Sequence, residues 1–390
     1  MTQHSQQQES NGGDRGAASP RNSELRVAIA HEWLIRYAGS ERVVEQLLAT
    51  FPGARILTTL VEPRSLPLGL GRAEPSFLNR VPGSRIHHEW LLGLMPLAWR
   101  LREPLDGVDA VVSSSHACAN AVRIAPGIPL VSYCHTPMRY AWDFAAERAR
   151  FPLALRPAAR LAMRWFRRWD RNTASKVTQF VANSRAVAGR IDRCYGRHAD
   201  VVHPPVRTEF FTPSGERGDR FLYVGRLTGY KRPDLVVEAF RGLPFGLDVV
   251  GDGPLFERLQ AAAGPNVRLL GSVDDERLRE LYRAARALVF PVDEDFGIAM
   301  AEAQACGTPV IGLASGGALD IIEDGVTGWL IQRQDLDELR RAIRHASIAP
   351  FSSEAARLGA ERFSEHRFRT RMRDVVGSVS GSRPRSGRRH

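Results

Sequence analysis

The sequence predicts an α/β protein with two domains. A chain of 390 residues is long enough for two domains of ordinary size. Short apolar runs that end in polar or glycine-bearing loops recur along it, and the run Ala287–Phe290 is typical of a buried parallel strand. Because two consecutive prolines form a stiff, extended linker, Pro204-Pro205 predicts a boundary between a domain over residues 25–208 and a second over 209–355.

The composition is that of a globular protein with an anionic partner. Hydrophobic residues make up 43% and charged residues 25% of the chain. The formal net charge of +11 indicates nucleotide phosphates, acidic lipid headgroups or nucleic acid as partners. Four cysteines without C-x-x-C spacing indicate buried thiols in a reducing compartment, not a zinc site or disulfides. No apolar stretch approaches the roughly 20 residues of a spanning helix, so we expect a cytoplasmic protein.

Both ends of the chain are predicted to be disordered. Residues 1–24 are rich in Gln, Ser and Gly and lack the apolar core of a secretory signal. Residues 379–390 form a short basic tail, which we expect to be solvated and mobile.

Two glutamates eight positions apart are the centre of the second domain. Glu294 lies in an acidic loop after a predicted strand, and Glu302 lies on the helix that begins at Phe296–Ile298. The first turn of such a helix offers free N–H groups and a positive dipole end. We expect both carboxylates to point toward one ligand at the carboxyl edge of the sheet. Gly316-Gly317 lets the backbone approach that ligand closely.

The sequence around these glutamates carries a resemblance to a known family. The Glu294-x7-Glu302 spacing, with E-D-F-G-I, E-A-x-A-C-G-T-P-V and G-G around it, resembles the retaining glycosyltransferases of the GT-B fold, family 4. The resemblance implies two facing Rossmann-like domains with a deep cleft between them. It also implies that a last helix, residues 360–378, packs back on the first domain. The segment CHTPMRYAWD resembles a subgroup that builds bacterial surface polysaccharides, notably mannosyltransferases.

Two cations next to one loop suit a departing diphosphate. The Gly-Arg-x4-Lys order places Arg226 and Lys231 beside a helix start, and a leaving diphosphate gains negative charge as the sugar departs. The resemblance implies that both residues bind the diphosphate. It also implies that Gly39, in a loop between a strand and a helix, lies against the diphosphate; a plain turn is the alternative there. We do not expect Arg226 and Lys231 to be an ordinary pair of surface cations without a ligand.

The resemblance also implies roles for the remaining candidates. Glu302 would hold the ribose hydroxyls, and the backbone at Val273 would meet the base. The residues that would position the sugar are Glu294, Phe296, Gly297 and Ile298. His135 follows a predicted strand, so we expect it to face the cleft, contact the donor and approach the acceptor hydroxyl, not to be a structural histidine. Arg139 is a candidate ligand for an acceptor phosphate, with an ordinary structural arginine as the alternative.

No metal or cofactor is expected. Asp293 and Asp295 form an Asp-x-Asp, which holds a divalent metal in another glycosyltransferase fold, but here they belong to the glutamate arrangement. Arg226 and Lys231 would supply the electrostatic stabilisation instead. His116 has no partner at metal-ligand spacing and is interpreted as structural or surface.

The predicted activity is retaining transfer of a hexose. GDP-mannose is the favoured donor, with a saccharide or lipid-linked saccharide acceptor; a UDP-sugar donor, or a nucleotide-sugar isomerase of the same fold, is the alternative. A nucleic-acid partner is not expected, because no recognised motif accompanies the basic residues. Residues 151–172 mix arginines with tryptophans, which suits a helix packed on the domain with its arginines solvated and also a helix lying on anionic lipid headgroups.

Overall fold

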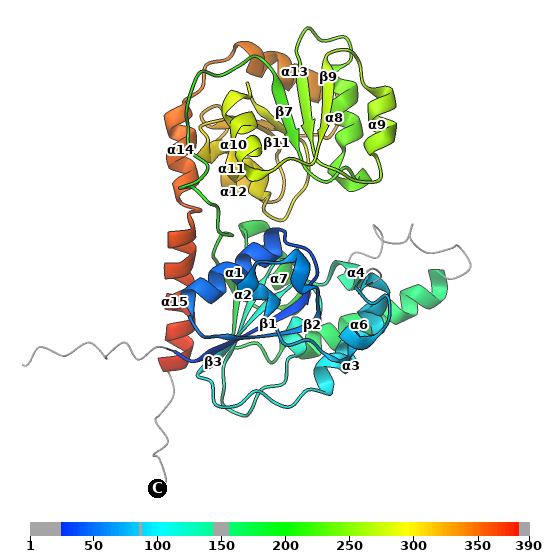
Figure 1. The fold of residues 1–390 in the computed structure, drawn as a ribbon, viewed down its shortest axis with the longest axis vertical. Coiled ribbons are helices and arrows are strands. Elements are labelled where there is room, and N and C mark those ends of the chain that lie inside the picture. The colour runs from blue at the N-terminus through cyan, green and yellow to red at the C-terminus, as the bar shows by residue number, and fades with distance from the viewer. Residues whose placement is uncertain (1–24, 86–87, 143–155, 382–390) are drawn as a thin grey trace, which may run out of the picture.

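The structure, a computed structural model, describes residues 25–85, 88–142 and 156–381. Two α/β domains lie one above the other, with the N-terminal domain below in Figure 1. The predicted N-terminal tail and the end of the basic tail, from residue 382, lie outside the described residues.

Each domain is built on a six-stranded parallel sheet. The first has the order β2-β1-β3-β4-β5-β6, with β1 (Val27–Leu34), β2 (Arg55–Val61), β3 (Ala110–Ser115), β4 (Leu130–Cys134), β5 (Gln179–Ala182) and β6 (Ala199–Val201). The second has the order β12-β11-β10-β7-β8-β9, with β7 (Phe221–Val224), β8 (Leu247–Val250), β9 (Val267–Gly271), β10 (Leu288–Phe290), β11 (Val310–Leu313) and β12 (Gly328–Ile331). Their strands are largely apolar because helices cover both faces of such sheets.

Helices connect the strands. Those of the first domain are α1 (Gly39–Thr50), α2 (Leu68–Gly71), α3 (Met95–Arg100), α4 (Arg139–Trp142), α6 (Arg156–Ala174) and α7 (Arg185–Tyr195), with short 3₁₀ turns η1 (Pro63–Ser65), η2 (Phe77–Arg80), η3 (His88–Leu94) and η4 (Ala119–Ala121). Those of the second are η7 (Gly229–Lys231), α8 (Pro233–Phe240), α9 (Phe256–Ala262), α10 (Asp275–Ala284), α11 (Ile298–Ala305), α12 (Ala318–Ile321), α13 (Leu336–Ile348) and α14 (Ser353–Glu361).

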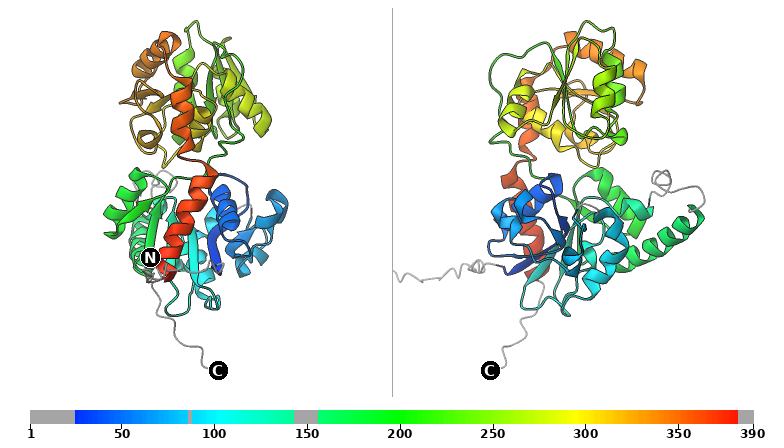
Figure 2. Two further views of the ribbon diagram at one scale, coloured as in Figure 1. Left: turned by 90° about the vertical axis from the view of Figure 1, so that its left-hand side faces the viewer. Right: turned by 45° about the vertical axis from the view of Figure 1, so that its right-hand side comes forward.

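The last helix, α15 (Glu365–Gly381), returns to the first domain. Figures 1 and 2 show α14 beside the C-terminal domain and α15 beside the N-terminal one. Phe368 and Met372 are buried in the same core cluster as Val27 of β1. The helix continues three residues past the predicted end at 378, and in its last turn the Ser380 hydroxyl donates to the Val376 carbonyl (2.8 Å).

The first strand is longer than predicted. The largely apolar run Leu25–Ala30 predicts a strand that ends at Ala30, whereas β1 pairs with β2 as far as Leu34. His31 and Glu32 therefore lie inside the sheet, where both side chains are fully buried.

The strand order of each sheet locates a ligand site. Neighbouring strands change from descending to ascending order at β1 and β3 in the first sheet, and at β10 and β7 in the second. Ligands of open α/β sheets bind at the carboxyl ends of the strands at such a switch point. The two switch points open into one cavity between the domains.

Candidate active site

A cavity of about 740 Å³ lies between the domains. Most of the predicted site residues line it, namely Gly39, His135, Arg226, Lys231, Glu294, Phe296, Gly297 and Ile298. Three predicted residues, Arg139, Val273 and Glu302, do not line it.

The cations and one carboxylate share the wall from the C-terminal domain. Arg226 follows β7, and its guanidinium donates to the Tyr230 hydroxyl (3.1 Å). The Lys231 ammonium is ion-paired with the Glu294 carboxylate. Lys231 ends the 3₁₀ turn η7 and does not head a helix as predicted, because Arg232 has a left-handed backbone (φ 51°) that separates it from α8. The wall can accept an anion at Arg226 and a hydroxyl-bearing group at Glu294.

The start of α11 faces the glycine loop of the other domain. Gly297 precedes the helix with φ 90°, a value that L-residues rarely adopt. A Cβ placed on Gly39 would lie 3.0 Å from the Ile298 side chain, so the loop before α1 and the start of α11 are in direct apposition. Free N–H groups at such a helix start suit an anionic or hydroxyl-rich ligand.

Gly316 and Gly317 hold the glutamate loop in place and do not line the cavity as the sequence suggested. The Gly317 N–H donates to the Glu294 carbonyl (2.8 Å). A Cβ on Gly316 would lie 2.1 Å from that carbonyl oxygen, and one on Gly317 would lie 2.2 Å from the Phe296 carbonyl oxygen. Their small size therefore lets the loop of Glu294 pack against the backbone behind it.

Gly317→Ala is expected to destabilise the protein by about 1–3 kcal/mol, because the new methyl group overpacks the loop. Urea unfolding would measure it. Gly229→Ala is the matched control: no atom lies within 4 Å of its Cβ position, so its free energy of unfolding should fall by less than about 0.5 kcal/mol. Equal stability of the two variants would contradict the packing role.

His135 lies at the carboxyl end of β4, as predicted, on the wall from the N-terminal domain. Its backbone N–H donates to the Ser115 carbonyl (2.8 Å), and the side-chain amide of Asn183 donates to the His135 backbone carbonyl (3.0 Å). The ring Nε2 lies 2.8 Å from the Ser114 hydroxyl. Burial, and then the neighbouring His116 and His31, lower the pKa of His135 to about 3, so the ring is neutral at pH 7.

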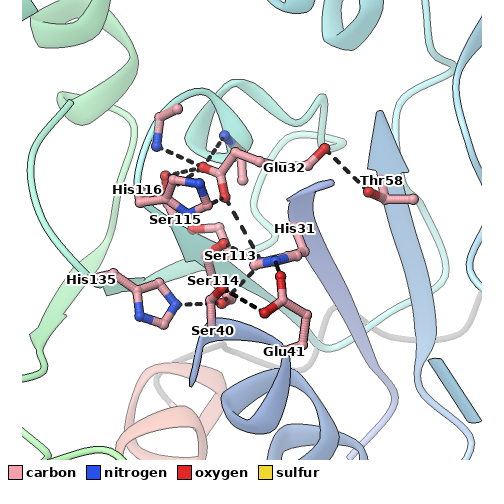
Figure 3. A network of polar contacts seen from close by, with 12 residues as sticks. His31, Glu32, Ser40, Glu41, Thr58, Ser113, Ser114, Ser115, His116 and His135 are labelled. Atoms are coloured by element: carbon pink, nitrogen blue, oxygen red, sulfur yellow. Dashed lines mark hydrogen bonds and ion pairs between the residues drawn. The ribbon is translucent and has the colours of Figure 1, made fainter. Parts of the chain in front are cut away.

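A buried carboxylate supports this wall from behind. Glu32 accepts hydrogen bonds from the backbone N–H groups of residues 116, 117 and 119 and from the Ser115 hydroxyl. Burial acts to raise its pKa, but His116, His31 and these N–H groups outweigh burial and lower the pKa to about 2. His116, interpreted from the sequence as structural or surface, lies on the cavity wall with its Nδ1 3.3 Å from Glu32 (Figure 3).

Glu302 lies behind the cavity wall. It is 4% exposed, and its carboxylate accepts from Arg42 (2.6 Å) and from the Tyr282 hydroxyl (3.2 Å). Arg42 comes from α1 of the other domain. Val273 packs against the apolar core of the second domain.

Arg139 is one of several arginines that cross between the domains. Its guanidinium donates to Asp295 (2.6 Å), which Arg190 also contacts. Arg185 of the N-terminal domain likewise forms an ion pair with Asp320 of the C-terminal domain. In each of these pairs the N-terminal domain supplies the cation and the C-terminal domain the anion, so the charges favour closure of the cleft.

The Asp-x-Asp aspartates are engaged with protein groups. Asp295 holds the arginines named above, and Asp293 accepts from the Ser315 hydroxyl (2.8 Å). Among residues 25–85, 88–142 and 156–381, no group of three or more His, Cys, Asp or Glu side chains is arranged to hold a metal ion. Metal independence of the reaction stays a prediction.

Asp170 of α6 anchors the end of the CHTPMRYAWD segment. Its carboxylate accepts from the Trp142 indole (2.7 Å) and the Tyr195 hydroxyl (2.7 Å). Burial raises the pKa of Asp170 to about 6, against these hydrogen bonds.

Asp170→Asn is expected to flatten part of the pH dependence of stability. A folded pKa near 6 and an unfolded pKa near 3.8 mean that the contribution of Asp170 is fully present below pH 3.8 and is lost as the pH rises through 6. Between pH 4 and pH 6.5, the free energy of unfolding of wild type should therefore fall by about 2–3 kcal/mol relative to that of the variant. Urea unfolding of both proteins at these pH values would measure it; parallel curves would contradict the raised pKa.

Comparisons with known proteins agree with this geometry. The model "Glycosyltransferase Family 4" matches residues 37–210, and "Glycosyl transferases group 1" matches residues 207–361. The D-inositol 3-phosphate glycosyltransferase of Mycobacterium avium is 32% identical over an alignment of 208 residues that covers 47% of this chain and 47% of that protein. The one from Geodermatophilus obscurus is 33% identical over an alignment of 210 residues that covers 45% of this chain and 46% of that protein. The chain thus spans about half the length of these relatives.

Solved structures share the architecture. Anabaena HepE in complex with UDP-glucose has a TM-score of 0.67 at 18% identity and covers 91% of this chain and 100% of its own. Sucrose-phosphate synthase from Thermosynechococcus elongatus has a TM-score of 0.68 at 20% identity, with coverages of 92% and 100%. These likenesses confirm the predicted fold. That fold is the GT-B fold, and the two glycosyltransferase family models, which meet at the interdomain linker, together match residues 37–361.

Proposed function

We propose that this protein is a retaining glycosyltransferase that moves a hexose, with GDP-mannose as the favoured donor, to a saccharide or lipid-linked saccharide. The observation that carries the proposal is the cavity itself. Lys231 and Arg226 lie with Glu294 on one wall, and the neutral ring of His135 lies on the other.

The cations would stabilise the departing diphosphate. As the bond between the sugar anomeric carbon and the phosphate oxygen breaks, negative charge grows beside Arg226 and Lys231. The acceptor hydroxyl forms the new bond on the same face, and its proton goes to an oxygen of the leaving diphosphate. His135 is not needed as the base, which agrees with its low pKa.

Donor binding would require changes on the C-terminal wall. Glu294 would release Lys231 to the diphosphate and turn to the sugar hydroxyls. Glu302 would hold the ribose only if Arg42 gives up its contact with that carboxylate. Arg139 would reach an acceptor phosphate only by leaving Asp295.

A UDP-sugar is the second candidate donor. Anabaena HepE, which has the same fold, was solved with UDP-glucose. The sequence segment CHTPMRYAWD favours GDP-mannose. An isomerase of the same fold is distinguished by turnover of the nucleotide sugar without an acceptor.

A thermal-shift screen against GDP, UDP, ADP and their sugars tests the proposal. A ligand at 100 times its dissociation constant stabilises the folded state by about 2.7 kcal/mol. We expect one nucleoside diphosphate and its sugar to raise the melting temperature clearly above the others. No stabilisation by any of them at millimolar concentration would overturn the donor site.

We further propose that the protein contacts an anionic membrane through α6 and α3, on the cytoplasmic face. Phe166 and Trp169 pack on the domain core, whereas Leu161 and Trp165 are 67% and 56% exposed. A cavity of about 460 Å³ beside them is lined by Leu97 and by cationic residues, Arg100, Arg123 and Lys176. Apolar side chains framed by cations suit acidic headgroups. Within the described residues, no helix is long and apolar enough to cross a bilayer.

Trp165→Glu is expected to weaken binding to phosphatidylserine-containing vesicles about tenfold, since the apolar contact is lost. Ile348→Glu is the matched control, because Ile348 is 82% exposed on α13 of the other domain. Vesicle sedimentation at low salt measures both. Equal binding to anionic and neutral vesicles by wild type would contradict the proposal.

A further inference from the structure

We infer that Ser114 is a positioning residue that holds His135 in the tautomer with its proton on Nδ1, so that His135 meets the substrate as a hydrogen-bond donor. The significance for turnover rests on the proposed function, but the tautomer itself does not. Figure 3 shows the chain of contacts that carries the inference, from Glu41 through His31 and Ser114 to His135.

The sheet brings these groups together at its switch point. Ser114 of β3 lies opposite His31 of β1 on one side and Tyr133 of β4 on the other. His135 follows β4 directly. Ser114 and His31 are both fully buried, so their polar atoms depend on each other for hydrogen bonds.

The proton positions of His31 follow from its partners. Its Nδ1 lies 2.9 Å from the Ser114 carbonyl oxygen, which only accepts, so Nδ1 donates. Its Nε2 lies 3.6 Å from a Glu41 carboxylate oxygen, which is close enough for electrostatic attraction but longer than a hydrogen bond. Burial acts to lower the pKa of His31, but Glu41 and Glu32 outweigh it and raise the pKa. Both carboxylates therefore favour the charged form of His31.

The Ser114 hydroxyl transmits this arrangement to His135. Its oxygen lies 3.2 Å from Nδ1 of His31 and accepts from that N–H. Its single hydrogen is then available for Nε2 of His135, 2.8 Å away. Nε2 accepts, so the proton of the neutral ring must sit on Nδ1. Burial, together with His116 and His31, lowers the pKa of His135 against the opposing effect of Glu32 and Glu41, so the ring is neutral.

Nδ1 is the ring nitrogen left for a ligand. Within the described part of the chain, it makes no hydrogen bond, and His135 lines the cavity. A fixed N–H there would recognise an oxygen acceptor, such as a sugar hydroxyl oxygen. The Glu41 carboxylate also accepts from the Ala38 N–H (3.1 Å) and the Ser40 hydroxyl (3.0 Å), on either side of Gly39. One buried series of polar contacts, through Glu41, His31 and Ser114, therefore joins the glycine loop to His135.

Nitrogen-15 NMR of protein labelled in its histidines tests the inference without any substrate. The His135 signals are assigned by their loss in His135→Gln. At pH 7.5 we expect His135 of wild type to show a protonated Nδ1 and an unprotonated Nε2, and His31 to show a protonated Nδ1. Protonation of His135 at Nε2 in wild type would overturn the inference, whatever the enzyme does with nucleotide sugars.

Two variants separate the tautomer from general stability. Ser114→Ala removes the hydroxyl, so the Nε2-protonated form of His135 should appear. Ser113→Ala, on the same strand, removes an equally buried hydroxyl that donates to Asn120 (2.6 Å) and should leave the tautomer unchanged. An unchanged tautomer in Ser114→Ala would overturn the role of Ser114. If Ser114→Ala fails to fold, the wild-type spectrum alone decides.

Discussion

Lys231→Met is expected to lower turnover by about 10²–10³-fold, the loss seen when one preorganised charge donor is removed from a developing anion. The Lys231 ammonium lies on the cavity wall beside Glu294, and we propose that it meets the leaving diphosphate. Because this contact strengthens in the transition state, kcat and kcat/KM should fall together. Steady-state kinetics with the nucleotide sugar that stabilises wild type would measure both.

Arg232→Gln is the matched control for Lys231→Met. Arg232 is the next residue, but its guanidinium contacts Asp234 and Gln334 and does not line the cavity. Its loss removes the same charge at nearly the same position in the sequence, and turnover should stay within about threefold of wild type, as for surface changes. A rise in KM alone for Lys231→Met would assign Lys231 to ground-state binding and contradict its role in departure.

Glu294→Gln is expected to lower turnover by about 10²-fold, the loss that a sugar misplaced by about 1 Å would produce. Glutamine keeps the shape of Glu294 but accepts more weakly from sugar hydroxyls and no longer pairs with Lys231. Nucleoside diphosphate affinity should be largely intact, since Arg226 and Lys231 remain. Kinetics and calorimetric titration of the diphosphate would separate the two effects.

Asp293→Asn provides the comparison for Glu294→Gln. Asp293 carries the neighbouring carboxylate, but it is exposed, accepts from Ser315 and does not line the cavity. Its turnover should stay close to that of wild type. Wild-type activity in Glu294→Gln would remove this residue from the sugar site.

The regular elements were largely predictable because their causes are local. Apolar runs such as Ala287–Phe290 read as buried strands, and β10 occupies that place. The wrong predictions concern segments whose conformation depends on contacts with distant parts of the chain or on an unusual backbone angle. β1 continues through His31 and Glu32 because β2 pairs with it there, although the sequence becomes polar. The helix expected at Lys231 is a 3₁₀ turn because Arg232 adopts a left-handed backbone.

Within the site, the residues on one loop were easier to predict than those on several. Glu294 and Phe296–Ile298 come from one continuous segment, and the structure brings them to the cavity together. The contact of Glu302 with Arg42 joins positions in different domains, and no spacing signals it. The adjacent serines of β3 carried no motif; only a buried polar run at a strand end, Ser113–Ser115, could have drawn attention to them.

The sequence by itself determined the α/β class, and it predicted a two-domain division at Pro204-Pro205 and the residues of the C-terminal wall, because these depend on periodicity, backbone stiffness and short segments. Only the tertiary structure decided that Glu294 and not Glu302 lines the cavity, and that the Ser114 hydroxyl lies between His31 and His135. Those facts arise from strand order and domain closure, which bring together atoms that are distant in the chain.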